Sequence, residues 1–89
     1  MTLQQLRYVD GVATCGSLSE ASRRLFVTQP TLTESIRGLE EELRIAIFSR
    51  SSRGVTLTRE GEEFLASARQ ILADAARIQP RAVPIGTPS

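Results

Sequence analysis

The segment from residue 17 to residue 43 contains two amphipathic helical patterns that are joined by a connection of only a few residues. The first pattern opens at Ser17, which together with Glu20 has the spacing of a capping box. The second opens at Thr28, a favourable N-cap residue, and it tolerates Pro30 because the first turn of a helix offers no partner for that N–H group. Two short helices joined in this way match the helix-turn-helix plan.

A further helix is predicted on each side of this unit. The first runs from Leu3 to about Cys15, with a capping box at Thr2, and Gly16 ends it. The last covers residues 59–78 and has acidic residues in its first turn, where the helix dipole favours them. Its broad apolar face consists of Phe64, Leu65, Ala68, Ile71, Leu72, Ala75 and Ile78.

Between residues 45 and 58 the hydrophobic period changes from that of a helix to that of a strand. Residues 45–50 are rich in apolar and β-branched residues, Ser51 to Gly54 predict a turn, and residues 55–58 alternate between apolar and polar. The predicted fold class is therefore mainly α: a winged helix-turn-helix with three helices and a two-stranded β-hairpin wing, followed by a long dimerisation helix. We expect residues 1–58 to form the winged domain, residues 59–78 the linker helix, and residues 79–89 a flexible tail or the start of a hinge.

The residue types that are missing limit the possible functions. The 89 residues contain 11 basic residues, all arginine, against 10 acidic ones, so the chain is not a uniformly cationic nucleic-acid binder. It has no histidine and only one cysteine, so the commonest metal ligand and general base are absent and no internal disulfide can form. Asp10 and Asp74 look isolated. The sequence predicts no catalytic site, no metal, no cofactor and no enzymatic activity.

The sequence also predicts a cytoplasmic location. The N-terminal residues lack the basic and apolar regions of a signal peptide, and the longest apolar run, residues 45–48, is too short to cross a bilayer. A single cysteine suits a reducing compartment. We therefore expect a soluble protein that has no membrane partner.

The second helix of the helix-turn-helix unit starts with uncharged polar groups and ends with three glutamates. Its apolar residues Leu32, Ile36 and Leu39 are expected to point inward, which leaves Glu34 and Arg37 on the opposite face. In a helix-turn-helix protein the start of this helix meets base edges in the major groove of DNA. The acidic end would be repelled by phosphates and should project away from the duplex.

The stretch "GSLSEASRRLFVTQPTLTESIRGLEEELRIAIFSRSSRGVTLTREG" resembles the N-terminal winged helix-turn-helix domain of LysR-type transcriptional regulators. The resemblance extends from about Leu3 to Ile78. It implies a bacterial regulator that binds double-stranded DNA at an interrupted inverted repeat and forms a homodimer through the linker helix. The complete protein would be a dimer or a tetramer. A small-molecule effector would bind only to a C-terminal domain that is absent from this chain.

Three positions depart from the family pattern. Glu34 stands where relatives often have a basic or amide side chain, so it either accepts a hydrogen bond from a cytosine amino group or merely repels. Arg44 replaces a glycine, so the helix ends differently or Arg44 adopts a left-handed conformation. Ser51 and Ser52 leave the wing tip with little positive charge.

The predicted roles follow the order of the chain. Gln29 and Thr31 or Thr33 are expected at base edges or phosphates, Pro30 at a thymine methyl group, and Thr28 at the cap and a phosphate. The arginines Arg23, Arg24, Arg37, Arg50 and Arg53 are expected to converge on the DNA face. The full set of predicted DNA-binding residues is Thr28, Gln29, Pro30, Thr31, Thr33, Glu34, Arg37, Arg50, Arg53 and Gly54.

Within the wing, we expect Arg53 to enter the minor groove, while Gly54 permits a tight turn and a close approach to the sugar–phosphate edge. Arg50 is expected to grip a phosphate or to be partly buried and paired with Glu40. The predicted dimerisation residues are Phe64, Leu65, Ala68, Ile71, Leu72 and Ala75. The alternative hypothesis is a winged-helix module for protein interaction that does not bind DNA, since a scaffold does not fix a function. Converging arginines would argue against that alternative.

Overall fold

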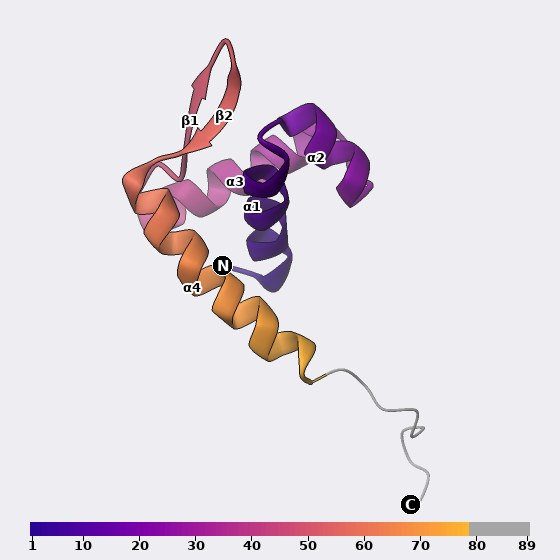
Figure 1. Ribbon diagram of the computed structural model, residues 1–89, viewed down its shortest axis with the longest axis vertical. Coiled ribbons are helices and arrows are strands. Elements are labelled where there is room, and N and C mark those ends of the chain that lie inside the picture. The colour runs from indigo at the N-terminus through magenta and orange to yellow at the C-terminus, as the bar shows by residue number, and fades with distance from the viewer. Residues whose placement is uncertain (79–89) are drawn as a thin grey trace, which may run out of the picture.

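The computed structural model of the chain describes residues 1–78. Within these residues, four helices and a two-stranded antiparallel sheet follow one another in the predicted order (Figure 1). The elements are α1 (Leu3–Cys15), α2 (Leu18–Leu25), α3 (Gln29–Leu43), β1 (Phe48–Ser51), β2 (Gly54–Leu57) and α4 (Arg59–Ala76). The predicted three helices, hairpin wing and long final helix are thereby confirmed.

The N-terminal caps explain where the first helices begin. The Thr2 hydroxyl accepts the N–H of Gln5 at 3.0 Å and the Gln5 side chain accepts the N–H of Thr2 at 2.9 Å, so the first capping box is confirmed. At α2 the Ser17 hydroxyl accepts the N–H of Glu20 at 3.2 Å. The reciprocal half predicted there is wrong, because the Glu20 carboxylate binds two arginines of its own helix instead.

Each of the first three helices ends at a residue in the left-handed conformation. These residues are Gly16 (φ 68°), Phe26 (φ 58°) and Arg44 (φ 57°). Glycine adopts this conformation at no steric cost, whereas a side chain raises the energy by roughly 1–2 kcal/mol. Of the two possibilities that the sequence left open for Arg44, the structure has the left-handed one. Phe26 is almost fully exposed, at 92%.

The core lies where α1 crosses α2, α3 and α4. It contains the apolar residues of α1 at helical spacing together with one face of α3, and both Val12 and Leu39 are fully buried. Burial of such a side chain contributes roughly 1.5–3 kcal/mol. The complete set of buried apolar residues is Leu6, Tyr8, Val9, Val12, Ala21, Leu32, Ile36, Leu39, Ile47, Leu65 and Ala68. The predicted inward face of α3 is therefore confirmed.

Strand β1 begins later than the sequence predicted. Residues 45–47 are apolar and β-branched, but the strand starts at Phe48. The reason is that the N–H groups before it have other partners. The N–H of Ile45 donates to the backbone carbonyl of Glu40 at 3.2 Å, and the N–H of Ile47 donates to the Glu40 carboxylate at 2.7 Å. These bonds tie the segment to α3 and keep it out of a ladder.

The hairpin is short, and its middle touches the turn between α1 and α2. Ser51 pairs with Gly54, so only two residues form the turn at its tip. None of the strand residues is buried. The N–H of Val55 donates to the carbonyl of Gly16 at 3.2 Å, and a Cβ atom on Gly54 would lie only 2.7 Å from the same carbonyl oxygen. This contact fixes one edge of the wing to the helical body.

Helix α4 starts directly on the base of the wing. Thr58 caps it by accepting the N–H of Gly61 at 2.9 Å, and the N–H of Thr58 donates to the carbonyl of Ile47 at 2.9 Å. Further along, an ion pair of 2.7 Å between Asp10 and Arg69 joins α1 to α4. The expectation that Asp10 is isolated was therefore wrong.

The far end of α4 differs slightly from the prediction, since the helix ends at Ala76 and a turn follows. The predicted tail, residues 79–89, lies outside the described residues. The division into residues 1–58 and 59–78 stays a prediction, although the first half of α4 shares the core of the preceding helices. None of the helices within residues 1–78 combines the length and the apolar character that a bilayer crossing requires.

Candidate nucleic-acid interface

The start of α3 presents uncharged hydrogen-bonding groups to solvent. Gln29, Pro30 and Thr31 are exposed, and Thr33 is half-buried one turn later. The Thr28 hydroxyl accepts the N–H of Thr31 at 3.3 Å and donates to the Thr31 hydroxyl at 2.9 Å. The helix dipole adds a partial positive charge at this end, which favours an anionic partner. The structure thus brings the predicted residues of this turn together on one accessible edge.

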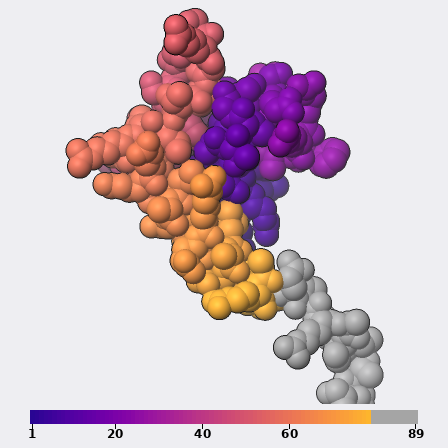
Figure 2. All heavy atoms as spheres, in the orientation of Figure 1, coloured from indigo at the N-terminus to yellow at the C-terminus, as the bar shows by residue number. Residues whose placement is uncertain are grey.

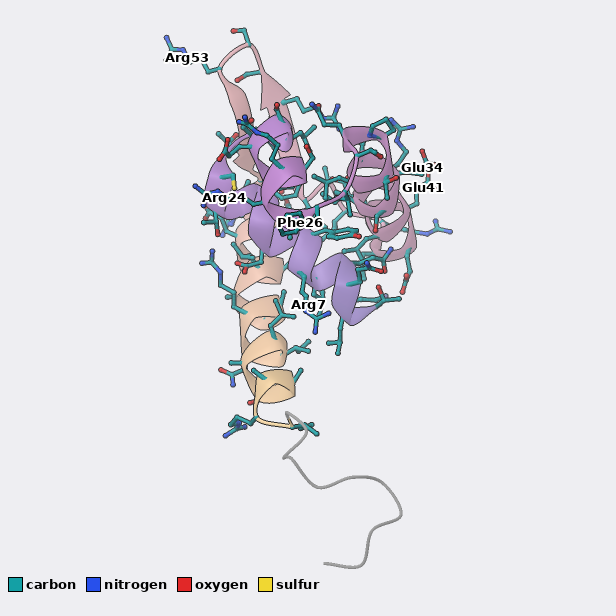
Figure 3. The ribbon with its side chains drawn as sticks, turned by 90° about the vertical axis from the view of Figure 1, so that its right-hand side faces the viewer. Arg7, Arg24, Phe26, Glu34, Glu41 and Arg53 are labelled. Atoms are coloured by element: carbon teal, nitrogen blue, oxygen red, sulfur yellow. The ribbon has the colours of Figure 1, made fainter. Side chains whose placement is uncertain are left out.

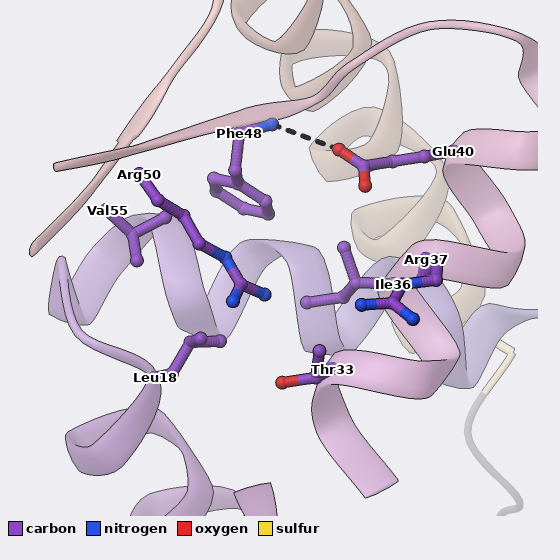
Figure 4. Close-up of a pocket in the computed structure, with 8 residues that line it drawn as sticks. All are labelled: Leu18, Thr33, Ile36, Arg37, Glu40, Phe48, Arg50 and Val55. Atoms are coloured by element: carbon purple, nitrogen blue, oxygen red, sulfur yellow. Dashed lines mark hydrogen bonds between the residues drawn. The ribbon is translucent and has the colours of Figure 1, made fainter. Parts of the chain in front are cut away.

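A cavity of about 190 Å³ lies between α3 and the wing (Figure 4). Arg37 enters it from α3 and Arg50 from β1, and Figure 4 shows both guanidinium groups directed into it. Neither arginine has an ion-pair partner among residues 1–78. The lining residues are Leu18, Thr33, Ile36, Arg37, Glu40, Phe48, Arg50 and Val55. Two guanidinium groups that form no ion pair, beside the apolar side chains of the lining, favour the binding of an anion.

Glu40 lines the same cavity but does not neutralise its arginines. One oxygen of its carboxylate accepts the N–H of Ile47 at 2.7 Å and the N–H of Phe48 at 3.3 Å. The predicted pairing of Arg50 with Glu40 is therefore wrong, because these backbone groups hold the carboxylate. The consequence is that Arg50 keeps its charge available while Glu40 fixes the wing to α3.

The tip of the wing stands clear of the helical body, as Figure 2 shows. Arg53 lies at this tip, and its side chain points into solvent (Figure 3). Its backbone N–H donates to the Ser51 hydroxyl at 3.2 Å, which stabilises the turn. Gly54 follows with φ of 120°, a conformation that side chains rarely adopt. An exposed arginine on a narrow projection can reach surfaces that the helices cannot.

The acidic residues of α3 divide into two groups. Glu40 and Glu42 have partners in the chain, since Glu42 binds the N-terminal ammonium group at 2.7 Å. Glu34 and Glu41 are exposed and point to the same side in Figure 3. Among residues 1–78, no three side chains of the kinds that commonly ligate metals lie close enough together to hold an ion.

The two arginines of α2 do not converge with those of α3 and the wing. Arg24 binds Glu20 at 3.2 Å and Arg23 binds the other oxygen of that carboxylate. The charge of Arg23, together with hydrogen bonds from both arginines, lowers the pKa of Glu20. Of the five arginines in the expected cluster, Arg23 and Arg24 thus share one carboxylate, whereas Arg37, Arg50 and Arg53 form no ion pair among residues 1–78.

The predicted dimerisation face of α4 is only partly accessible. Leu65 and Ala68 are buried in the core of the chain itself, and Phe64 packs against that core. Leu65 and Ala68 do not belong to an exposed face, because the first half of α4 covers α1, whereas Phe64 stays partly exposed. Ile71 is 40% exposed, and Ile78 at the end of the pattern is 81% exposed. The other two predicted residues, Leu72 and Ala75, are partly buried.

The sequence interpretation missed the contacts that hold the wing in place. It assigned the close approach of Gly54 to a sugar–phosphate edge, whereas the structure places Gly54 against the carbonyl of Gly16. It also placed Glu40 in an acidic helix end that projects away from DNA or pairs with Arg50, and did not foresee its bonds to the N–H groups of Ile47 and Phe48. The sequence did contain one signal. Gly16 and Gly54 each stand beside a turn, and a glycine permits another backbone segment to approach closely.

Comparisons with known proteins agree with this geometry. Over residues 3–62 the chain matches the family model described as bacterial regulatory helix-turn-helix protein, lysR family. It is 41% identical over 88 residues to the HTH-type transcriptional regulator ClcR of Pseudomonas putida, covering 97% of this chain and 30% of ClcR. It is also 41% identical over 88 residues to the HTH-type transcriptional regulator BudR of Klebsiella aerogenes, covering 97% of this chain and 62% of BudR. The chain thus spans only part of the length of these relatives.

Solved structures with the same fold include complexes with DNA. The crystal structure of the CbnR_DBD–DNA complex has a TM-score of 0.83 and 42% sequence identity, covering 86% of this chain and 88% of that one. The complex of BenM_DBD with catB site 1 DNA has a TM-score of 0.83 and 37% identity, covering 88% of this chain and 84% of that one.

Proposed function

The chain belongs to the lysR family of bacterial regulatory helix-turn-helix proteins, and we propose that it is the part of a transcriptional regulator that binds specific DNA sequences. The observation that carries the proposal is the cavity between α3 and the wing, into which Arg37 and Arg50 direct two guanidinium groups that form no ion pair among residues 1–78. Similar solved structures, those of CbnR_DBD and BenM_DBD, are complexes with DNA, which supports it.

In this proposal the first turn of α3 meets base edges in the major groove. Gln29 donates and accepts hydrogen bonds, Pro30 contacts a thymine methyl group, and Thr31 or Thr33 reaches a base or a phosphate. Thr28 caps the helix and lies at a phosphate. The exposure of this turn and its lack of formal charge support these roles. Uncharged donors and acceptors can distinguish base pairs, and they are not drawn strongly to the phosphates of the DNA backbone.

The arginine-lined cavity has a natural ligand in this arrangement. A helix in the major groove and a wing in the neighbouring minor groove lie on either side of one sugar–phosphate strand. The space between them is the cavity that Arg37 and Arg50 share. A phosphate there accepts hydrogen bonds from both guanidinium groups, and the apolar side chains of the lining strengthen these bonds by excluding water. These contacts would set the position of the protein without reading the sequence.

This assignment predicts how salt affects the variants Arg37→Ala and Arg50→Ala. Each should weaken binding to all DNA sequences by a similar factor and reduce the slope of log K against log salt by about 0.9 for each phosphate that the variant no longer neutralises. Fluorescence anisotropy with a selected site and with unrelated DNA, at several salt concentrations, measures both quantities. Arg77→Ala is the matched control, because Arg77 lies after the far end of α4 and pairs with Asp74. An unchanged slope in both cavity variants would contradict the proposal.

The second half of α4 is the proposed contact with another copy of the chain. Ile71 is an apolar residue that is substantially exposed on this helix, and neighbouring alanines permit a close approach of a partner helix. Twofold pairing would present two α3 helices to two half-sites, which requires an inverted repeat in the DNA. Ile71→Glu should convert dimers to monomers in sedimentation while leaving the helical circular dichroism of the folded chain nearly unchanged. Dimers that persist in this variant would place the interface elsewhere.

The alternative function, a protein-interaction module that does not bind DNA, has no observation in its favour. Such a module has no need for two unpaired arginines facing one cavity. If the chain selected no sequence from random DNA at low salt, the DNA-binding proposal would fail and this alternative would replace it.

A further inference from the structure

Glu34 is the only charged residue in the first two turns of α3, and it has no partner among residues 1–78. Its surroundings are uncharged: it forms a shallow hollow with Pro30, Thr31 and Ser35. Arg37, one turn later on the same helix, could have offset this charge but turns instead into the cavity beside the wing. The carboxylate therefore remains free on a surface that otherwise lacks charge.

Helical geometry places Glu34 at the centre of the exposed ridge of α3. Leu32 and Ile36 are buried, and each is two residues away from Glu34, which corresponds to about 200° of rotation around the helix. Glu34 thus points almost directly away from the core, as Figure 3 shows. Glu41 shares this ridge but lies about 10 Å further along the axis, towards the end that faces away from the proposed contact. A helix that enters a groove with its first turns brings Glu34 closest to the groove floor.

A carboxylate in this position strongly limits which base can lie opposite. Guanine and thymine present acceptors in the major groove, and these repel it. Adenine has an amino donor, but the acceptor N7 lies next to it. On cytosine the amino group is the only polar group at the major-groove edge, so a carboxylate can accept its hydrogen bond without meeting an acceptor on the same base.

We infer that Glu34 selects cytosine at one position of each half-site by accepting a hydrogen bond from its N4 amino group. The inference rests on the proposed DNA-binding function and adds the identity of one base. The selection has two parts. The hydrogen bond favours cytosine, and repulsion between the carboxylate and base acceptors disfavours the other three bases.

Selection of bound sites from random DNA, with the complete 89-residue chain, tests this inference. The unmodified chain should enrich cytosine at one position in each half-site, with a preference of about 5- to 150-fold over other bases, the usual range for a good direct contact. Glu34→Gln should change the preference to adenine at that position, because an amide pairs with N6 and N7 together. Glu34→Ala should accept all four bases there.

Two controls separate direct reading from other effects. Glu34→Asp keeps the charge but shortens the side chain, so cytosine preference should fall while guanine and thymine stay disfavoured. Replacing the selected cytosine by 2-pyrimidinone, which pairs with guanine but lacks the N4 amino group, should weaken binding of the unmodified chain and leave Glu34→Ala unaffected.

The outcomes distinguish this inference from the proposed function. If the unmodified chain selects no DNA sequence, the DNA-binding proposal itself fails. If it selects a sequence, but Glu34→Gln and Glu34→Ala select the same one, the proposal stands and direct reading by Glu34 is overturned. An adenine preference in Glu34→Gln at the position where the unmodified chain prefers cytosine would establish the contact.

Discussion

Helix α3 and the β1–β2 wing both present side chains on the proposed DNA face, but they are held to the domain by different forces. Three buried residues along α3, Leu32, Ile36 and Leu39, anchor the helix to the core. The wing has no fully buried strand residue: Phe48, Val55 and Leu57 pack against the core while staying partly exposed, and hydrogen bonds add to this weaker anchoring. These bonds end on the carbonyl of Gly16 and the carboxylate of Glu40.

The difference teaches that one interface can combine a rigid part with an adjustable part. Apolar packing is insensitive to small changes in solvent or salt, and it fixes the rotation of α3 about its own axis, which decides which residues face outward. A few hydrogen bonds at the base of a hairpin are weaker and can open locally. We expect α3 to keep its orientation while the wing changes position. Three substitutions test this contrast, from the largest expected effect to the smallest.

Leu39→Ala should have the largest effect, because it removes a fully buried side chain that anchors α3. The expected loss in the free energy of unfolding is about 2–5 kcal/mol. Thr56→Ala, on an exposed position of β2, is the matched control and should change stability by no more than about 0.5 kcal/mol. Urea denaturation followed by circular dichroism measures both. Equal losses would show that the wing contributes as much to stability as the anchor of α3.

Glu40→Leu should release the wing without unfolding the helices. It leaves the N–H groups of Ile47 and Phe48 without their acceptor, which costs about 1–3 kcal/mol where these groups stay buried. Hydrogen exchange at these two amides should become faster, while exchange in α1 stays slow. Glu40→Gln keeps an acceptor oxygen and should restore most of the protection. If exchange accelerated equally in α1 and at Ile47, Glu40 would be part of the core rather than a separate anchor of the wing.

Arg53→Ala should have the smallest effect, since the side chain is exposed and contributes nothing to folding. If Arg53 enters a minor groove, affinity should fall about tenfold on operators with A·T-rich flanks, whose narrow grooves attract arginine, and less on G·C-rich flanks. Titrations with the two kinds of flank at one salt concentration provide the comparison. Equal losses would indicate a phosphate contact, and no loss would mean that Arg53 only keeps the tip soluble.

The same contrast explains how much could be predicted from the sequence. The helices, their caps at Thr2 and Thr28, and the inward face of α3 follow from local spacing, which a single sequence displays. The hairpin follows from the change of hydrophobic period after residue 45, and the family resemblance identified it as a wing. The start of β1 was predicted too early because the N–H of Ile45 donates to the backbone carbonyl of Glu40 and the N–H of Ile47 donates to its carboxylate.

For the candidate site, the exposed start of α3 was predictable and the partners of its charges were not. Glu20 was read as part of a capping box and Glu40 as part of an acidic helix end, yet each determines which arginines remain unpaired. These outcomes depend on which side chain comes within hydrogen-bond distance in three dimensions. The burial of Leu65 and Ala68 was missed for a similar reason, since an apolar face on α4 does not indicate whether its own chain or another covers it.

The contact of Gly61 with Ile47 joins the first turn of α4 directly to the base of the wing. A Cβ atom on Gly61 would lie 2.0 Å from the carbonyl oxygen of Ile47, so the first turn of α4 rests directly on the chain that leads into β1. The helix extends about 22 Å from Gly61 to its end at Ala76. A sideways shift of about 5 Å at its far end corresponds to a tilt of roughly 13° at Ile47. No side chain separates Gly61 from Ile47, so a tilt of α4 would be transmitted to the backbone that leads into β1. Leu65, Ala68 and the Asp10–Arg69 ion pair hold the first half of α4 against the core, so this packing limits how far a shift at the far end changes the spacing between the wing and α3.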